Sequence, residues 1–174
     1  MLALACAAAW LGGGPLAAQL PLSLEGRGGV AVPAETFAGA DGGVAVEVSA
    51  TWHALPLVGI YGAYQGNRFG REGTEDHATD RGFAAGVRVA VPTPLIPIDP
   101  WIRAGLVTHR LRAEGLAHES EPGVEVGAGL AFPLARRITL TPGVLWTRYR
   151  HGATADQRVR VRHLRADVGL RMHL

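Results

Sequence analysis

Three serines and seven histidines are the residues of this sequence whose types could support nucleophilic or acid–base chemistry. Ser49 and His53 share the polar face of one predicted strand, but four residues of extended chain separate them by roughly 13 Å. A nucleophilic serine needs its base within hydrogen-bonding reach, so a catalytic pair would need a partner from another strand. Ser120 follows His118 in a predicted loop, where a site is poorly preorganised. We therefore predict no catalytic residues and no enzyme activity.

The other residues that could bind a metal do not form a recognisable site. His77, His118 and His151 fall in three different predicted loops, and no HxxxH or HExxH spacing occurs. Cys6 is the only cysteine and lies in the N-terminal apolar stretch, which excludes disulfides and cysteine metal sites elsewhere in the chain. A net charge of +2 is too small to indicate a nucleic-acid partner. The sequence predicts neither a metal site nor a cofactor.

Nine charged residues share another property, because each lies on the polar side of a segment in which polar and apolar residues alternate. They are Glu25, Arg27, Glu47, Arg88, Arg103, Glu125, Arg165, Asp167 and Arg171. Charges enclosed in a protein must pair, and this set is nearly balanced. The same faces are rich in glycine, which weakens a strand but fits a narrow interior. We interpret the nine as an enclosed, structural ion-pair network; the alternative is a solvated charged face.

The alternation itself predicts the elements that carry these charges. Successive side chains of a strand point to opposite faces, so a period of two indicates a strand with one apolar face. Eight segments show this pattern: 22–32, 44–53, 57–65, 82–91, 100–109, 123–132, 138–149 and 163–174. Their connections alternate between short links (54–56, 92–99, 133–137) and long links (33–43, 66–81, 110–122, 150–160). This layout is typical of an up-and-down barrel with turns at one rim and loops at the other.

Two kinds of barrel differ in where the apolar face points. A soluble barrel of lipocalin type buries that face, whereas a membrane barrel turns it to lipid. The balanced charges and the glycines favour a polar interior. Aromatic residues near the strand ends match two interfacial girdles, although strict alternation turns Trp101 inward: Trp52, Trp101 and Phe132 near the turns, and Tyr64, Phe83, Trp146 and Tyr149 near the loops. We predict an all-β fold, an eight-stranded antiparallel up-and-down transmembrane β-barrel, with a secreted lipocalin-like barrel as the alternative.

An apolar stretch over residues 2–18 ends in small residues, which is typical of a secretory signal peptide. We predict a signal peptide over residues 1–18, cleaved after Ala18, and a barrel domain over residues 19–174. The missing basic n-region predicts a truncated start, and an uncleaved membrane anchor is the alternative.

The last strand carries apolar residues at every second position back from Leu174. This pattern resembles the C-terminal strand of bacterial outer-membrane barrels, as do the segments LEGRGGVAVP, PWIRAGLVTHRL and FPLARRITLTPGVLW. The chain resembles the small, eight-stranded, porin-like family over residues 20–174. The resemblance implies a bacterial outer-membrane location, lipid and lipopolysaccharide as partners, and recognition of the last strand by the barrel-assembly machinery. Most family members end on an aromatic residue, so Leu174 implies a weaker assembly signal.

Arginines cluster around the last predicted loop: Arg148, Arg150, Arg158, Arg160 and Arg162. Guanidinium groups grip phosphates in bidentate fashion, so we expect contacts with lipopolysaccharide phosphates; the alternative is a solvated loop without a specific ligand. The predicted function is structural or at the cell surface, in adhesion or membrane integrity, with an interior filled by side chains. The alternatives are passage of small molecules, or a lipid-modifying enzyme with a serine–histidine pair formed across strands.

Overall fold

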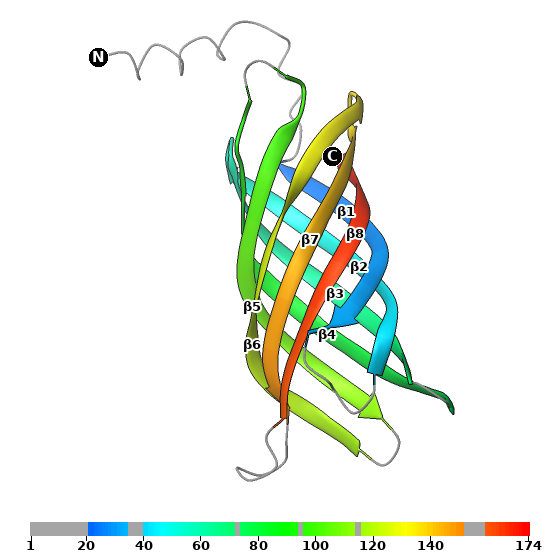
Figure 1. The fold of residues 1–174 in the computed structure, drawn as a ribbon. Helices are drawn as coiled ribbons and strands as arrows, with labels where there is room; N and C mark the ends of the chain where they lie inside the picture. Colours follow the sequence, from blue (N-terminus) through cyan, green and yellow to red (C-terminus); the bar gives the residue numbers. More distant parts are fainter. Residues whose placement is uncertain (1–20, 35–39, 72–73, 94–95, 114–115, 152–158) are drawn as a thin grey trace, which may run out of the picture.

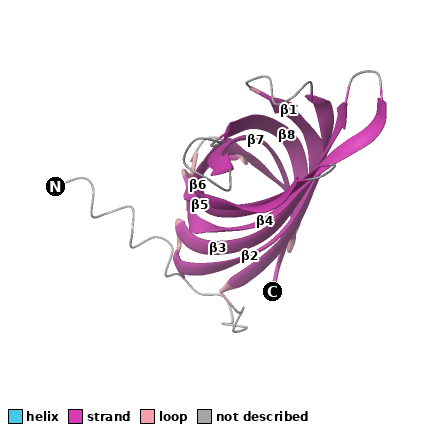
Figure 2. Ribbon diagram, turned by 90° about the horizontal axis from the view of Figure 1, so that it is seen from below, coloured by secondary structure: helices cyan, strands magenta, loops and turns pink. Residues whose placement is uncertain are grey.

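The computed structural model is a closed barrel of eight antiparallel strands (Figure 1). It describes residues 21–34, 40–71, 74–93, 96–113, 116–151 and 159–174. The strands are β1 (Leu22–Pro33), β2 (Ala40–Leu55), β3 (Val58–Arg71), β4 (Thr74–Ala90), β5 (Asp99–Ala113), β6 (Leu116–Ala135), β7 (Ile138–His151) and β8 (Val159–His173). Each strand pairs with its neighbours in sequence, and β1 pairs with β8 to close the ring (Figure 2). The predicted fold is confirmed.

The two ends of the barrel meet at the turn rim. The amide of Leu174 donates to the carbonyl of Leu22 at 3.0 Å, and the amide of His173 donates to the carbonyl of Arg137 at 2.9 Å. An even number of strands brings both ends of the barrel to one rim. The predicted signal peptide lies outside the described residues. Among the described residues, no helix is long and apolar enough to cross a membrane.

The strands are staggered around the barrel. From Val30, the pairings through β2, β3 and β4 lead to Arg112 on β5. The pairings in the other direction, through β8, β7 and β6, lead to Ile102, ten residues away on the same strand. Strand number and stagger together set the diameter of a barrel, and eight strands leave an interior that side chains can fill.

The apolar faces of the strands point outward. Val48 and Phe83 are each 66% exposed, and Leu106 is 65% exposed. Charged residues such as Glu47 and Arg103 are buried, with only 2% and 3% of their surface exposed. This is the orientation predicted for a membrane barrel and the reverse of the lipocalin-like alternative.

The strands are longer than predicted on the loop side. The expected loops 66–81 and 110–122 are largely strand, because β3 and β4 pair as far as Arg71 and Thr74, and β5 and β6 as far as Ala113 and Leu116. Beyond the apolar belt both faces of a strand are polar, so these segments lack the alternation by which strands are recognised. His77, His118 and His151 consequently belong to strands β4, β6 and β7 rather than to loops.

Candidate functional site

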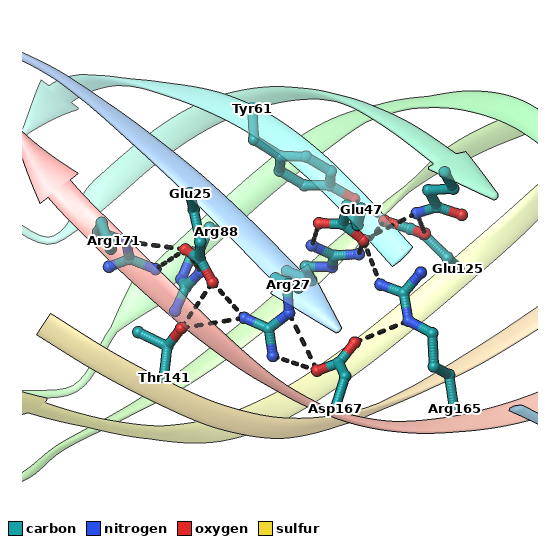
Figure 3. A network of polar contacts seen from close by, with 12 residues as sticks. Glu25, Arg27, Glu47, Tyr61, Arg88, Glu125, Thr141, Arg165, Asp167 and Arg171 are labelled. Carbon is teal, nitrogen blue, oxygen red and sulfur yellow. Dashed lines mark hydrogen bonds and ion pairs between the residues drawn. The ribbon is translucent and has the colours of Figure 1, made fainter. Parts of the chain in front are cut away.

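The structure brings all nine predicted charged residues together inside the barrel (Figure 3). They come from six strands, and alternation turns each of them inward: Glu25 and Arg27 of β1, Glu47 of β2, Arg88 of β4, Arg103 of β5, Glu125 of β6, and Arg165, Asp167 and Arg171 of β8. Each of them takes part in at least one ion pair.

Glu25 is the centre of the part nearer the turn rim. One of its carboxylate oxygens accepts from Arg88 at 2.9 Å and from Arg171 at 2.6 Å. The other accepts from the Thr141 hydroxyl at 2.7 Å and from Arg27. One buried carboxylate therefore serves three arginines.

Glu47 is the centre of the second part. The Arg103 guanidinium grips it with two hydrogen bonds, at 2.7 and 2.8 Å, and Arg165 contributes a further ion pair. Arg103 also lies 3.2 Å from Glu125. Asp167 joins the two parts, because it accepts from Arg27 and from Arg165, the latter at 2.7 Å. The network is continuous across the interior.

Neutral polar residues complete the network, and the sequence did not single them out as site residues. The Tyr61 hydroxyl donates to Glu125 at 2.5 Å, and the Gln65 amide donates to the same carboxylate at 2.7 Å. Both residues, like Thr141, lie on the polar faces of their strands. Their position on that face was the signal that could have identified them.

Trp101 is part of the interior rather than of an aromatic girdle. Its side chain is 1% exposed, its ring lies 4.0 Å from the Arg88 guanidinium carbon, and its indole N–H donates to the Leu130 carbonyl. A Cβ added at Gly129 or Gly143 would lie 2.5 Å from the ring, so the neighbouring strands need glycine there. The assignment of Trp101 to an aromatic girdle is wrong, because it relied on the closeness of Trp101 to a strand end. The alternation of the strand decides whether a side chain points to the interior or to the exterior.

Tyr149 is the second aromatic residue that the girdle prediction misplaced. It is 2% exposed and donates to Asp80 at 2.9 Å, while its ring stacks on His109 at 4.8 Å between centroids. Asp80 also contacts His109 Nδ1 at 2.8 Å. The ring of His163 packs edge-on against Tyr149. The sequence missed Asp80 because it lay in an expected loop.

A serine and a histidine do meet across strands. Ser23 Oγ of β1 lies 3.0 Å from His53 Nε2 of β2. However, Ser23 is only 1% exposed, and among the described residues no carboxylate is hydrogen-bonded to His53. The imidazole of His53 instead lies beside that of His173, at 5.9 Å between centroids. An enclosed hydroxyl without an oriented base is poorly placed to attack a lipid.

The described side chains contain no group of three or more histidines, cysteines or acids that could hold a metal ion. His77, His118 and His151 are placed only by their backbone.

The arginines of the last hairpin lie mainly on strands rather than in a loop. Arg148 of β7 is paired with Arg162 of β8, and Arg150 is paired with Arg160. Arg148 follows Trp146 on the outward face, at the loop side of the apolar belt. Arg158 lies outside the described residues. The pairing places like charges directly opposite each other.

Comparisons with known proteins give similarity in structure only. No model of a known protein family matches the chain, and no curated protein matches it. Neisserial surface protein A is similar over 88% of this chain and 97% of its own, with a TM-score of 0.70 and 14% identity. OprG of Pseudomonas aeruginosa is similar over 90% of this chain and 98% of its own, with a TM-score of 0.54 and 11% identity.

A third similar structure is Ail, the attachment invasion locus protein of Yersinia pestis. The similarity covers 87% of this chain and 97% of the Ail chain, with a TM-score of 0.50 and 14% identity. The apolar exterior and these neighbours support the predicted location in the bacterial outer membrane. The chain therefore has the fold of the small eight-stranded outer-membrane β-barrels, which its C-terminal strand was predicted to resemble.

Proposed function

We propose that this chain is an integral outer-membrane protein with a structural or cell-surface role, without enzyme activity and without a conducting channel. The observation that carries the proposal is the ion-pair network across the interior. Glu25, Glu47 and Glu125 are each at most 3% exposed. Two of their ion pairs cross the interior, because Glu25 of β1 pairs with Arg88 of β4 and Glu47 of β2 pairs with Arg103 of β5. Ions and water would have to displace these contacts to pass.

The first test is conductance. The protein is expressed in a Gram-negative host, purified from the outer-membrane fraction, shown to be folded by a heat-modifiable shift in gel mobility, and inserted in planar lipid bilayers. We expect the conductance of the bare bilayer. Stable ohmic steps that depend on protein concentration would contradict the proposal and favour passage of small molecules.

We further propose that the arginines of the β7–β8 hairpin contact lipopolysaccharide phosphates. Arg148 and Arg162 are paired in the register of β7 and β8, which places two guanidinium groups close to each other on this hairpin. Guanidinium groups bind phosphates in bidentate fashion, so a phosphate at this hairpin would have two donor groups within reach. Long loops of outer-membrane barrels are extracellular, so this rim would meet the lipopolysaccharide leaflet.

The test replaces Arg158, Arg160 and Arg162 together by Glu and measures binding of lipopolysaccharide to the detergent-solubilised protein. We expect affinity to fall by about tenfold or more. The matched control is Arg136→Glu with Arg137→Glu, two exposed arginines in the turn between β6 and β7 at the opposite rim. Unchanged binding by the hairpin variant would refute this contact.

A further inference from the structure

A groove of about 420 Å³ lies on the outer surface across β2, β3 and β4. Its lining includes Val44, Val46, Gly66, Arg68, Thr79 and Arg81. Val44 and Val46 are 63% and 58% exposed, which places them on the lipid-facing side of the barrel. The groove is therefore separate from the interior network.

The strand register explains the hollow. Gly66 lies directly between Val46 on β2 and Arg81 on β4, so the position that would fill the groove carries no side chain. A Cβ added there would meet only Val46 Cγ2, at 3.5 Å, which is an ordinary contact. Packing thus does not require glycine at this position. Because Gly66 has no side chain, space is left beside the two valines.

Two arginines border this space. Arg68 and Arg81 are exposed diagonal neighbours on β3 and β4, a relation that places Cβ atoms about 7–8 Å apart. None of the residues that line the groove is acidic. Within the described part of the chain neither arginine has an ion-pair partner. Arg81 is also paired with Arg110 of β5, which is paired in turn with Glu119 of β6.

From its position relative to the outward aromatic rings, we expect the groove to lie at the height of lipid head groups. Tyr64 and Phe83 face outward on β3 and β4, with ring centroids 5.1 Å apart, and they lie where an interfacial aromatic girdle is expected. Arg68 follows Tyr64 by four residues, and Arg81 precedes Phe83 by two, so both lie on the loop side of these rings. Exposed valines beside two guanidinium groups match the chemistry of a phosphorylated lipid.

We propose that this groove binds one molecule of the phosphorylated glycolipid of the outer leaflet. A phosphate lies between Arg68 and Arg81, and the start of an acyl chain lies over Val44, Val46 and the bare backbone of Gly66. The site rests on the proposed outer-membrane location. It is distinct from the β7–β8 arginines, because β3 and β7 are four strands apart in a ring of eight.

The test counts lipid A molecules bound per barrel by native mass spectrometry of the detergent-solubilised protein. The compared variants are Arg68→Glu with Arg81→Glu, the hairpin triple variant, and the Arg136→Glu, Arg137→Glu control. We expect two bound molecules for the original chain and for the control, and one for each of the other variants. Two molecules on the groove variant would overturn this site while leaving the hairpin proposal intact. Two molecules on the hairpin variant would overturn the hairpin proposal while leaving this site intact.

The shape of the groove is tested without changing charge. Gly66→Leu fills it, whereas Gly62→Leu adds the same side chain on the same face of β3, where nothing lies within 4 Å. We expect lipid A affinity to fall about tenfold for Gly66→Leu only. Equal affinity of the two variants would overturn the acyl contact. Equally tight binding of dephosphorylated lipid A would overturn the contact between phosphate and the two arginines. Equally tight binding of phosphatidylglycerol would overturn the choice of a glycolipid as the ligand.

Discussion

Glu25 shows how much of the interior depends on a single residue. It is the ion-pair partner of Arg88 and Arg171 and also contacts Arg27. Removal of one member of a buried ion pair is strongly destabilising, because the remaining charge is left uncompensated. The sequence could predict that Glu25 faces inward among other charges. It could not predict that three arginines converge on it, since that depends on the stagger between distant strands.

Replacing Glu25 by Ala is therefore expected to lower the free energy of unfolding by at least about 3 kcal/mol. The control is Glu125→Gln, where an amide oxygen at the Oε1 position still accepts from Tyr61, whereas the contact from Gln65 to Oε2 is lost and the one arginine contact, at 3.2 Å, is weakened. The measurement is urea unfolding in lipid vesicles, followed by tryptophan fluorescence. Similar small losses for both variants would show that the interior charges are solvated.

At the scale of the strands, alternation predicted the elements well inside the apolar belt and poorly outside it. All eight predicted segments overlap strands, and residues such as Val48 and Leu106 lie on the predicted outward face. The long extensions of β3 to β6 were missed, because strands that project into water need no apolar face. Trp101 and Tyr149 were misplaced for a related reason: closeness to a strand end was weighed above alternation.

The outward face of β8 gives a prediction at this scale. Val168 lies near the middle of the strand and is 51% exposed, whereas Leu164 lies closer to the loop rim. An arginine on the lipid face costs about 2–4 kcal/mol at the bilayer midplane and about 0–1 kcal/mol near the interface. We expect Val168→Arg to lower the free energy of unfolding in vesicles by more than Leu164→Arg does. Equal losses would mean that β8 does not cross the bilayer centre.

At the scale of the whole molecule, the barrel separates two sets of arginines. The inner set, such as Arg27 and Arg103, is enclosed and paired with carboxylates. The outer set, such as Arg68 and Arg81, is exposed. The interior filled by side chains and the rim rich in guanidinium groups are the two features on which we base the proposal of a lipid-contacting protein without a conducting channel.

This separation predicts that salt affects the stability of the barrel and its lipid binding differently. The Debye length falls from about 30 Å at 0.01 M to about 3 Å at 1 M ionic strength, and salt screens exposed charges far more than buried ones. Over that range, we expect the urea midpoint in zwitterionic vesicles to change little, while lipid A affinity falls severalfold because the rim arginines are exposed. A midpoint that falls together with the affinity would mean that salt reaches the network around Glu25 and Glu47. Water and ions would then enter the barrel, and a narrow channel would become the better description of its interior.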